Sequence, residues 1–125
     1  MREGEYYEFG PFKLICVERR LLRDGRPVTM TNKAFDTLLA LVGRSGHLVK
    51  KSELFDAVWK DSCVEEGNLA VTISMLRKAL GDSPKDQKYI QTITKRGYRF
   101  VACARHLKID ELPDAAQFMM LHPHS

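Results

Sequence analysis

The sequence predicts an α+β domain in which a small antiparallel sheet is followed by three helices and a carboxy-terminal β-hairpin. Short apolar runs separated by turn signals fill the first thirty residues, apolar residues then recur with helical spacing, and two β-prone runs flank a glycine-containing tip further on. At 125 residues with 44% hydrophobic residues, the chain can form one core followed by a tail. We therefore expect one domain over residues 1–104 and a linker or tail over residues 105–125, where the chain could be truncated.

The amino-terminal sheet is predicted from turn dipeptides between apolar runs. The short apolar runs read YYEF, FKLICV, RLLR and RPVTM, with the strong turn signals Gly10-Pro11 after the first run and Asp24-Gly25 after the third. These runs predict an antiparallel sheet of about four short strands.

Two helices are predicted in the next part of the chain. The first covers about residues 32–44, with Thr31 or Asn32 as its N-cap. Its apolar residues recur at the i, i+3, i+4 and i+7 positions, namely Phe35, Leu38, Leu39 and Val42. The second helix is shorter, about residues 51–58, and has an apolar face made by Leu54 and Val58, to which Phe55 could also belong.

A third helix is predicted over about residues 68–80, ending at Gly81. Its apolar stripe must be buried and consists of Leu69, Ile73, Leu76 and Leu80. The opposite face, with Arg77 at its border, consists of Asn68, Val71, Ser74, Met75 and Lys78. Val71 stands out among these polar neighbours. It is either an isolated surface apolar residue of the common kind or a contact for a partner.

After the third predicted helix, the β-prone stretch YIQTITKRGYRFVA predicts a hairpin with Lys95, Arg96 and Gly97 at its tip. Tyr98 and Phe100 alternate with Arg99, and we expect these two aromatic side chains in the core, not stacked on bases. After residue 104 clear periodicity is lost, although a short helix at residues 114–121 could dock on the domain or on a partner.

Positive charge is concentrated in the last third of the predicted domain. Residues 68–103 contain seven Lys or Arg and two Asp or Glu, net +5, whereas residues 1–67 are balanced and residues 104–125 carry net −1. Such an excess is expected for a polyanionic partner, although a charge cluster is usually only a solvated face. The order of elements is that of a winged helix, in which a helix fits the major groove of duplex DNA and a hairpin reaches the minor groove.

Cysteine, histidine and hydropathy patterns argue against several other classes of protein. Cys16, Cys63 and Cys103 are odd in number and widely spaced, so we expect reduced, buried thiols and neither a disulfide framework nor a zinc site. The histidines lack the spacing of metal ligands and no catalytic motif stands out, so we expect no enzyme activity, metal, cofactor or small-molecule substrate. No apolar run is long enough to cross a bilayer, and a cytoplasmic protein is expected.

Two strings carry a family resemblance. VEEGNLAVTISMLRKALGD and YIQTITKRGYRFVA, with the preceding sheet, resemble the OmpR/PhoB-type winged-helix DNA-binding domain of bacterial transcription regulators over about residues 6–103. The chain has no room for the receiver domain of response regulators, so it looks like the ToxR/CadC branch, and control by phosphorylation is not expected. The resemblance implies a four-stranded amino-terminal sheet, a recognition helix in the major groove, a wing in the minor groove and tandem binding to direct repeats.

The resemblance also implies roles for individual residues. Val71 would pack against thymine methyl groups. Other DNA contacts would come from Asn68 and Thr72 near the helix start, Arg77 and Lys78 on phosphates or bases, Lys95 and Arg96 on phosphates, and Arg99 at the minor groove. Several family members have arginines where this chain has Ser74 and Met75, so their base readout does not transfer to it. The loop from Trp59 to Glu66, including Lys60, Asp61 and Glu65, could contact RNA polymerase.

Two other functions stay open at this stage. A winged helix can serve protein contacts, since a fold does not fix a function. The charge excess also permits binding to RNA, or to DNA without sequence preference. Sequence-specific binding to duplex DNA, with transcription regulation, is the function that the motifs favour.

Overall fold

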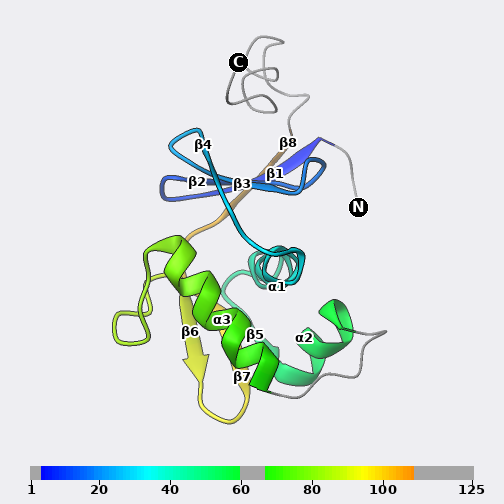
Figure 1. Ribbon diagram of the computed structural model, residues 1–125, viewed down its shortest axis with the longest axis vertical. Helices are drawn as coiled ribbons and strands as arrows, with labels where there is room; N and C mark the ends of the chain where they lie inside the picture. Colours follow the sequence, from blue (N-terminus) through cyan, green and yellow to red (C-terminus); the bar gives the residue numbers. More distant parts are fainter. Residues whose placement is uncertain (1–3, 60–66, 109–125) are drawn as a thin grey trace. The chain divides into compact units, whose positions relative to one another are not determined.

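A computed structural model describes residues 4–59 and 67–108, and it divides the chain into two compact units. Among the described residues, the first unit comprises residues 4–29 and 103–108, and the second lies within Met30–Ala102. Figure 1 labels the elements along the chain. In chain order they are β1 (Glu5–Phe9), β2 (Phe12–Ile15), β3 (Arg20–Arg23), β4 (Arg26–Val28), α1 (Asn32–Val42), β5 (Leu48–Lys50), α2 (Lys51–Val58), α3 (Gly67–Leu80), β6 (Ile90–Ile93), β7 (Gly97–Phe100) and β8 (Arg105–Lys108).

The first unit is an antiparallel sheet with the strand order β4-β3-β2-β1-β8. The four predicted amino-terminal strands are present, but β8 adds a fifth, so residues 105–108 are part of the sheet and not of a tail. Strand β8 pairs with β1, and Leu107 packs against a buried cluster of Tyr6, Ile15 and Leu22. Three of its four side chains are exposed, which is why apolar periodicity did not predict this edge strand.

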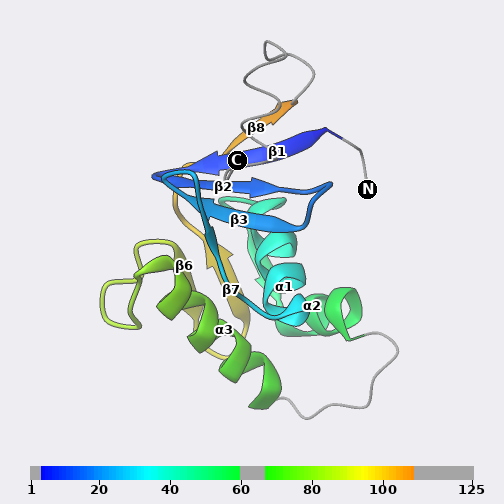
Figure 2. The same ribbon diagram turned by 45° about the horizontal axis from the view of Figure 1, so that its top comes forward.

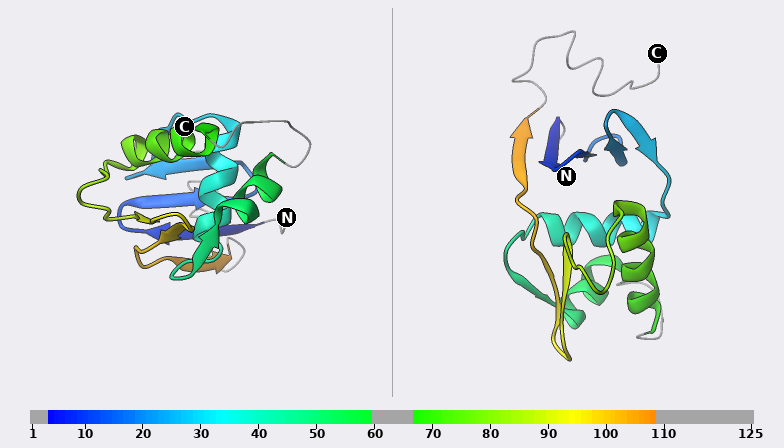
Figure 3. Two further views of the ribbon diagram at one scale, coloured as in Figure 1. Left: turned by 90° about the horizontal axis from the view of Figure 1, so that it is seen from below. Right: turned by 90° about the vertical axis from the view of Figure 1, so that its left-hand side faces the viewer.

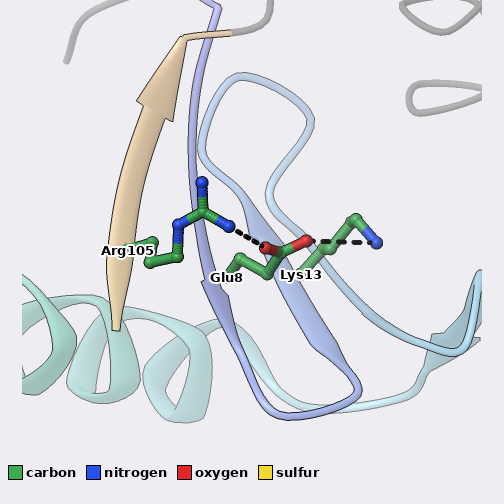
Figure 4. Close-up of polar contacts among 3 residues, drawn as sticks. All are labelled: Glu8, Lys13 and Arg105. Atoms are coloured by element: carbon green, nitrogen blue, oxygen red, sulfur yellow. Dashed lines mark hydrogen bonds and ion pairs between the residues drawn. The ribbon is translucent and has the colours of Figure 1, made fainter. Parts of the chain in front are cut away.

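Polar contacts also hold β8 on β1. Figure 4 shows the Glu8 carboxylate between two cations, with Arg105 Nη1 at 3.3 Å from Oε1 and Lys13 Nζ at 3.5 Å from Oε2. His106 contacts the Glu5 carboxylate and stacks on Tyr7 with ring centroids 4.7 Å apart. The two Glu8 ion pairs are exposed enough to contribute well under about 1 kcal/mol each, whereas the Glu5 carboxylate that His106 contacts is buried.

The cysteines do not all behave as expected. Cys16 is buried, and burial together with the Glu5 carboxylate raises the pKa of its thiol. Cys103 is exposed, so the prediction of a buried thiol is wrong for this residue. Cys63 lies outside the described residues.

In the parts of the chain that the structure describes, no His, Cys, Asp and Glu side chains gather into a possible metal site, and no helix is long and apolar enough to cross a membrane.

The second unit is built around α1. Of the two predicted candidates, Thr31 is its N-cap, because the Thr31 hydroxyl accepts a hydrogen bond from Ala34 N at 3.1 Å. Helix α1 packs against α2, α3 and β7. Its end at Val42 is two residues earlier than predicted. The core contains Phe35, Leu38 and Leu41 from α1, Leu54 from α2, the α3 stripe Leu69, Ile73, Leu76 and Leu80, and Tyr98 and Phe100 from β7.

The predicted hairpin is present, but it belongs to a three-stranded antiparallel sheet with the order β5-β7-β6. Strand β5 was not predicted, because three residues are too few to show an alternating pattern. It pairs with β7 and leads directly into α2. The first turn of α2 is therefore tied to the hairpin, and Lys51 N donates to Arg96 O at 3.2 Å.

Candidate nucleic-acid interface

Helix α3 presents one buried and one exposed face, as the apolar spacing predicted. The apolar stripe is at most 2% exposed. The side chains of Asn68, Val71, Ser74, Met75 and Lys78 are exposed on the other face. Val71 is 58% exposed and Met75 is 42% exposed, which makes them two of the few large apolar side chains at the surface of the described residues. One turn of helix separates the two residues, so they form a single apolar patch among polar neighbours.

Two predicted contact residues on α3 face the interior instead. Thr72 is 7% exposed, and its hydroxyl donates to Asn68 O at 2.8 Å within the helix. Arg77 is 8% exposed, and its Nη2 donates to Ile90 O at 3.0 Å and to Thr92 Oγ1 at 2.7 Å. Arg77 was placed at the border of the exposed face from helical spacing. The structure shows that its guanidinium joins α3 to β6.

The hairpin carries the other predicted residues. Lys95 and Arg96 are exposed in the turn between β6 and β7, and Lys95 has a φ of 64°. Arg99 is half-buried, with Nη1 donating to Gln91 Oε1 at 3.3 Å and with Nε buried without a hydrogen-bond partner among the described residues. Tyr98 and Phe100 are buried, which confirms the interpretation that these rings belong to the core.

Asp82 organises the connection between α3 and the hairpin, a role that no sequence motif indicated. Helix α3 ends in a Schellman motif, with Gly81 at a φ of 72° and Asp82 N donating to Arg77 O at 2.7 Å. The Asp82 carboxylate then accepts four backbone hydrogen bonds of 2.7–3.2 Å, from the amides of Ser83, Lys88, Tyr89 and Ile90. The one signal in the sequence was an aspartate immediately after the C-cap glycine.

The pKa of Asp82 reflects these contacts. Partial burial of the carboxylate acts to raise its pKa, but the four backbone amides together outweigh this and hold the pKa below its ordinary value. The ionised side chain is therefore the form that the folded loop stabilises.

Helix α3 and the β6–β7 hairpin lie side by side in Figures 1 and 2. The right-hand view of Figure 3 also shows the start of α3 and the hairpin turn at the same end of the second unit. The amino-terminal end of α3 and the turn that carries Lys95 and Arg96 therefore share one end of the Met30–Ala102 unit. An exposed helix face beside a basic hairpin has the form needed to enter two adjacent grooves of a duplex. The predicted polymerase-contact residues Lys60, Asp61 and Glu65 lie outside the described residues.

Known proteins and structures resemble this chain. The transcriptional activator CadC of Escherichia coli is 37% identical over 83 residues, which are 66% of this chain and 16% of CadC. The transcriptional regulator HilA of Salmonella typhimurium is 34% identical over 87 residues, which are 70% of this chain and 16% of HilA. The chain thus matches only a small part of each relative.

Solved structures agree with the fold. The DNA-binding domain of E. coli CadC is 30% identical with a TM-score of 0.71, over 83% of this chain and 98% of that chain. The DNA-binding domain of Klebsiella pneumoniae RstA, solved in complex with RstA box, is 26% identical with a TM-score of 0.69, over 77% of this chain and 96% of that chain.

The family model described as "Transcriptional regulatory protein, C terminal" matches residues 25–100, which span α1, α2, α3 and the β6–β7 hairpin. Because that match covers more than half of the chain, the protein belongs to this family of winged-helix transcriptional regulators, the OmpR/PhoB type that its motifs resemble.

Proposed function

We propose that this domain binds duplex DNA in a sequence-specific manner and so regulates transcription, with α3 in the major groove and the β6–β7 hairpin at the adjacent minor groove. The observation that carries the proposal is the exposed face of α3, where Val71 and Met75 lie among Asn68, Ser74 and Lys78. Polar side chains on such a face can hydrogen-bond base edges, and apolar ones can contact thymine methyl groups. The RstA domain bound to its DNA box, a structural relative, supports the same assignment.

The proposal extends to how the domain assembles on DNA and where it acts. We expect a tandem dimer on direct repeats, no catalytic activity, and a site of action in the cytoplasm, where bacterial DNA is found. RNA polymerase is a proposed partner through the loop that contains Lys60, Asp61 and Glu65.

Selection from a pool of random duplex DNA tests the proposal. The chain is incubated with the pool at near-physiological salt and with excess competitor DNA, and the retained molecules are sequenced. We expect an enriched motif, repeated about one helical turn apart. Salt-sensitive retention without a motif would indicate a non-specific binder, and no retention would favour a protein-contact module.

Val71→Ala is expected to change base preference at one position of the enriched motif. The substitution removes two methyl groups from a side chain that is 58% exposed in the free protein, so it affects a contact and not the core. We expect a loss of about 1 kcal/mol, or roughly fivefold in affinity, confined to sites with thymine at that position. Affinities are compared for duplexes with thymine and with uracil, which lacks the methyl group. The wild type should distinguish the two bases and the variant should not. Equal discrimination by both proteins would exclude a Val71–methyl contact.

Lys78→Ala is expected to weaken binding to every duplex by a similar factor. Lys78 is exposed in the last turn of α3, and a phosphate contact carries no sequence information. We expect the slope of log K against log salt to become less negative by about 1, with base preference unchanged. Lys85→Ala, at an exposed loop position, is the matched control and should leave the slope nearly unchanged. A Lys78→Ala variant that changes the enriched motif would contradict a pure phosphate contact.

A further inference from the structure

An open pocket of about 530 Å³ lies between the first turn of α2 and the hairpin turn, within the second unit. Its lining residues are Leu48, Lys50, Lys51, Ser52, Lys95 and Arg96. Four of the six side chains are cationic and none is acidic. The family resemblance pointed to Lys95 and Arg96 as hairpin contacts, but it did not point to Lys50, Lys51 or Ser52.

The backbone holds the two sides of this pocket together. Lys50 pairs with Gly97 in the β5–β7 ladder, and Lys51 N donates to Arg96 O at 3.2 Å. The cations of the β5–α2 junction and those of the hairpin turn therefore come from segments more than forty residues apart in the sequence, yet they line one pocket. Ladder pairing fixes this arrangement, so the cations are gathered before any ligand arrives.

The local acidic residue does not neutralise the pocket. Glu53 caps the start of α2 by accepting from Lys50 N at 2.9 Å, and it pairs with Arg44 Nη1 at 2.6 Å. The backbone hydrogen bond from Lys50 and then the contact with Arg44 lower the pKa of Glu53, so its carboxylate is ionised and engaged outside the pocket lining. Like charges that share a pocket repel one another, and an anion bound among them relieves the repulsion.

We propose that this pocket binds a phosphate group. In the complex assigned under the proposed function, on which this inference rests, the group is a backbone phosphate of duplex DNA flanking the groove that α3 enters. Lys50, Lys95 and Arg96 supply the charge, and the Ser52 hydroxyl can donate a further hydrogen bond. Free phosphate has the same chemistry and is the alternative source. The pocket thus adds an anchor beside the hairpin that fixes the orientation of the domain on the duplex without reading its sequence.

Charge removal in the full chain tests the proposal. Lys50→Gln/Arg96→Gln keeps much of the side-chain length and loses two charges, and Lys85→Gln/Lys88→Gln removes two charges from exposed loop positions as the matched control. We expect the salt slope of duplex binding to become less negative by about 1 in the pocket variant only, with base preference retained. Lys95→Asn is a second variant for the same measurement, because asparagine tolerates the φ of 64° at this position. Equal slopes in pocket and control variants would exclude a backbone phosphate from the pocket.

A second arm replaces DNA with inorganic phosphate. Amide resonances of Ser52, Lys95 and Arg96 are followed by NMR as phosphate replaces chloride at constant ionic strength. Saturating shifts that the pocket variant lacks, without a slope difference on DNA, would support a phosphate pocket but assign it to free phosphate. The absence of both the slope difference and the saturating shifts would overturn the proposal. If the wild type binds no duplex at all, the proposed function fails, and the phosphate titration alone still decides whether the pocket binds its ligand.

Discussion

Gly97→Ala should lower the free energy of unfolding of this protein by about 3 kcal/mol or more. A Cβ atom at this position would lie 2.1 Å from Val49 O and 2.9 Å from Lys50 Cα. Both are backbone atoms of β5, so no side-chain rotation relieves the clash, and β5 and β7 must separate. We expect a melting temperature lower by more than about 10 °C, since 1 kcal/mol corresponds to roughly 4–8 °C in a domain of this size. Thermal unfolding followed by circular dichroism measures the shift.

Gly46→Ala is the control for this substitution. Gly46 lies in the same unit, has a φ of 85° and has nothing within 4 Å of an added Cβ. Alanine there costs only the strain of a left-handed backbone, about 1 kcal/mol. Equal losses in the two variants would show that the close approach of β5 to Gly97 does not determine the requirement for glycine.

The basic pocket between β5, α2 and the hairpin turn depends on the β5–β7 ladder. Gly97→Ala should therefore also disrupt this pocket and weaken DNA binding.

Asp82→Asn should destabilise the folded protein by about 2 kcal/mol, a value already reduced because the carboxylate is only partly buried. The native side chain accepts hydrogen bonds from Lys88 N at 2.7 Å and Tyr89 N at 2.9 Å, one through each carboxylate oxygen. The amide group of asparagine keeps one acceptor and turns a donor toward two backbone N–H groups. Urea unfolding at pH 7 gives the difference. Asp86→Asn removes the same charge from an exposed position in the same loop and should change stability little.

The contribution of Asp82 should depend on pH in a defined direction. Because the folded-state pKa is lowered, the stabilisation is fully present above the unfolded-state pKa of about 3.9 and is lost as pH falls through the folded-state value. The difference in unfolding free energy between wild type and Asp82→Asn should thus stay constant from pH 7 to about pH 5 and shrink below about pH 4. A difference that persists unchanged at low pH would mean that the ionised carboxylate is not the stabilising form.

The contacts made by Asp82 and Gly97 also position the two parts of the candidate interface, α3 and the hairpin. Asp82 and Arg77 together join the end of α3 to β6, through the Asp82 contacts with Tyr89 N and Ile90 N and the Arg77 contact with Ile90 O. Gly97 joins the hairpin to β5. Helix α3 and the hairpin are therefore held as one body, which is a condition for reading two adjacent grooves at once.

Local sequence patterns determined much of this fold. Apolar spacing placed Leu69, Ile73 and Leu76 in the core and Val71 at the surface, because a helix repeats every 3.6 residues whatever it packs against. Turn dipeptides separated β1 from β2 and β3 from β4, and Thr31 was one of two candidates for the start of α1. These signals depend on residues close together in the chain, so no tertiary information was needed to interpret them.

Tertiary structure alone decided the rest. Strands β5 and β8 are three and four residues long and are stabilised by pairing with β7 and β1, which no local pattern records. Arg77 points inward because β6 offers it a carbonyl and a hydroxyl, although helical spacing put it at the border of the exposed face. The basic pocket exists because β5 brings Lys50 to the hairpin turn. The sequence by itself determined which residues form the helices and which face of α3 is exposed, whereas long-range hydrogen bonding decided that Arg77 faces β6 and that Lys50 lies beside the hairpin turn.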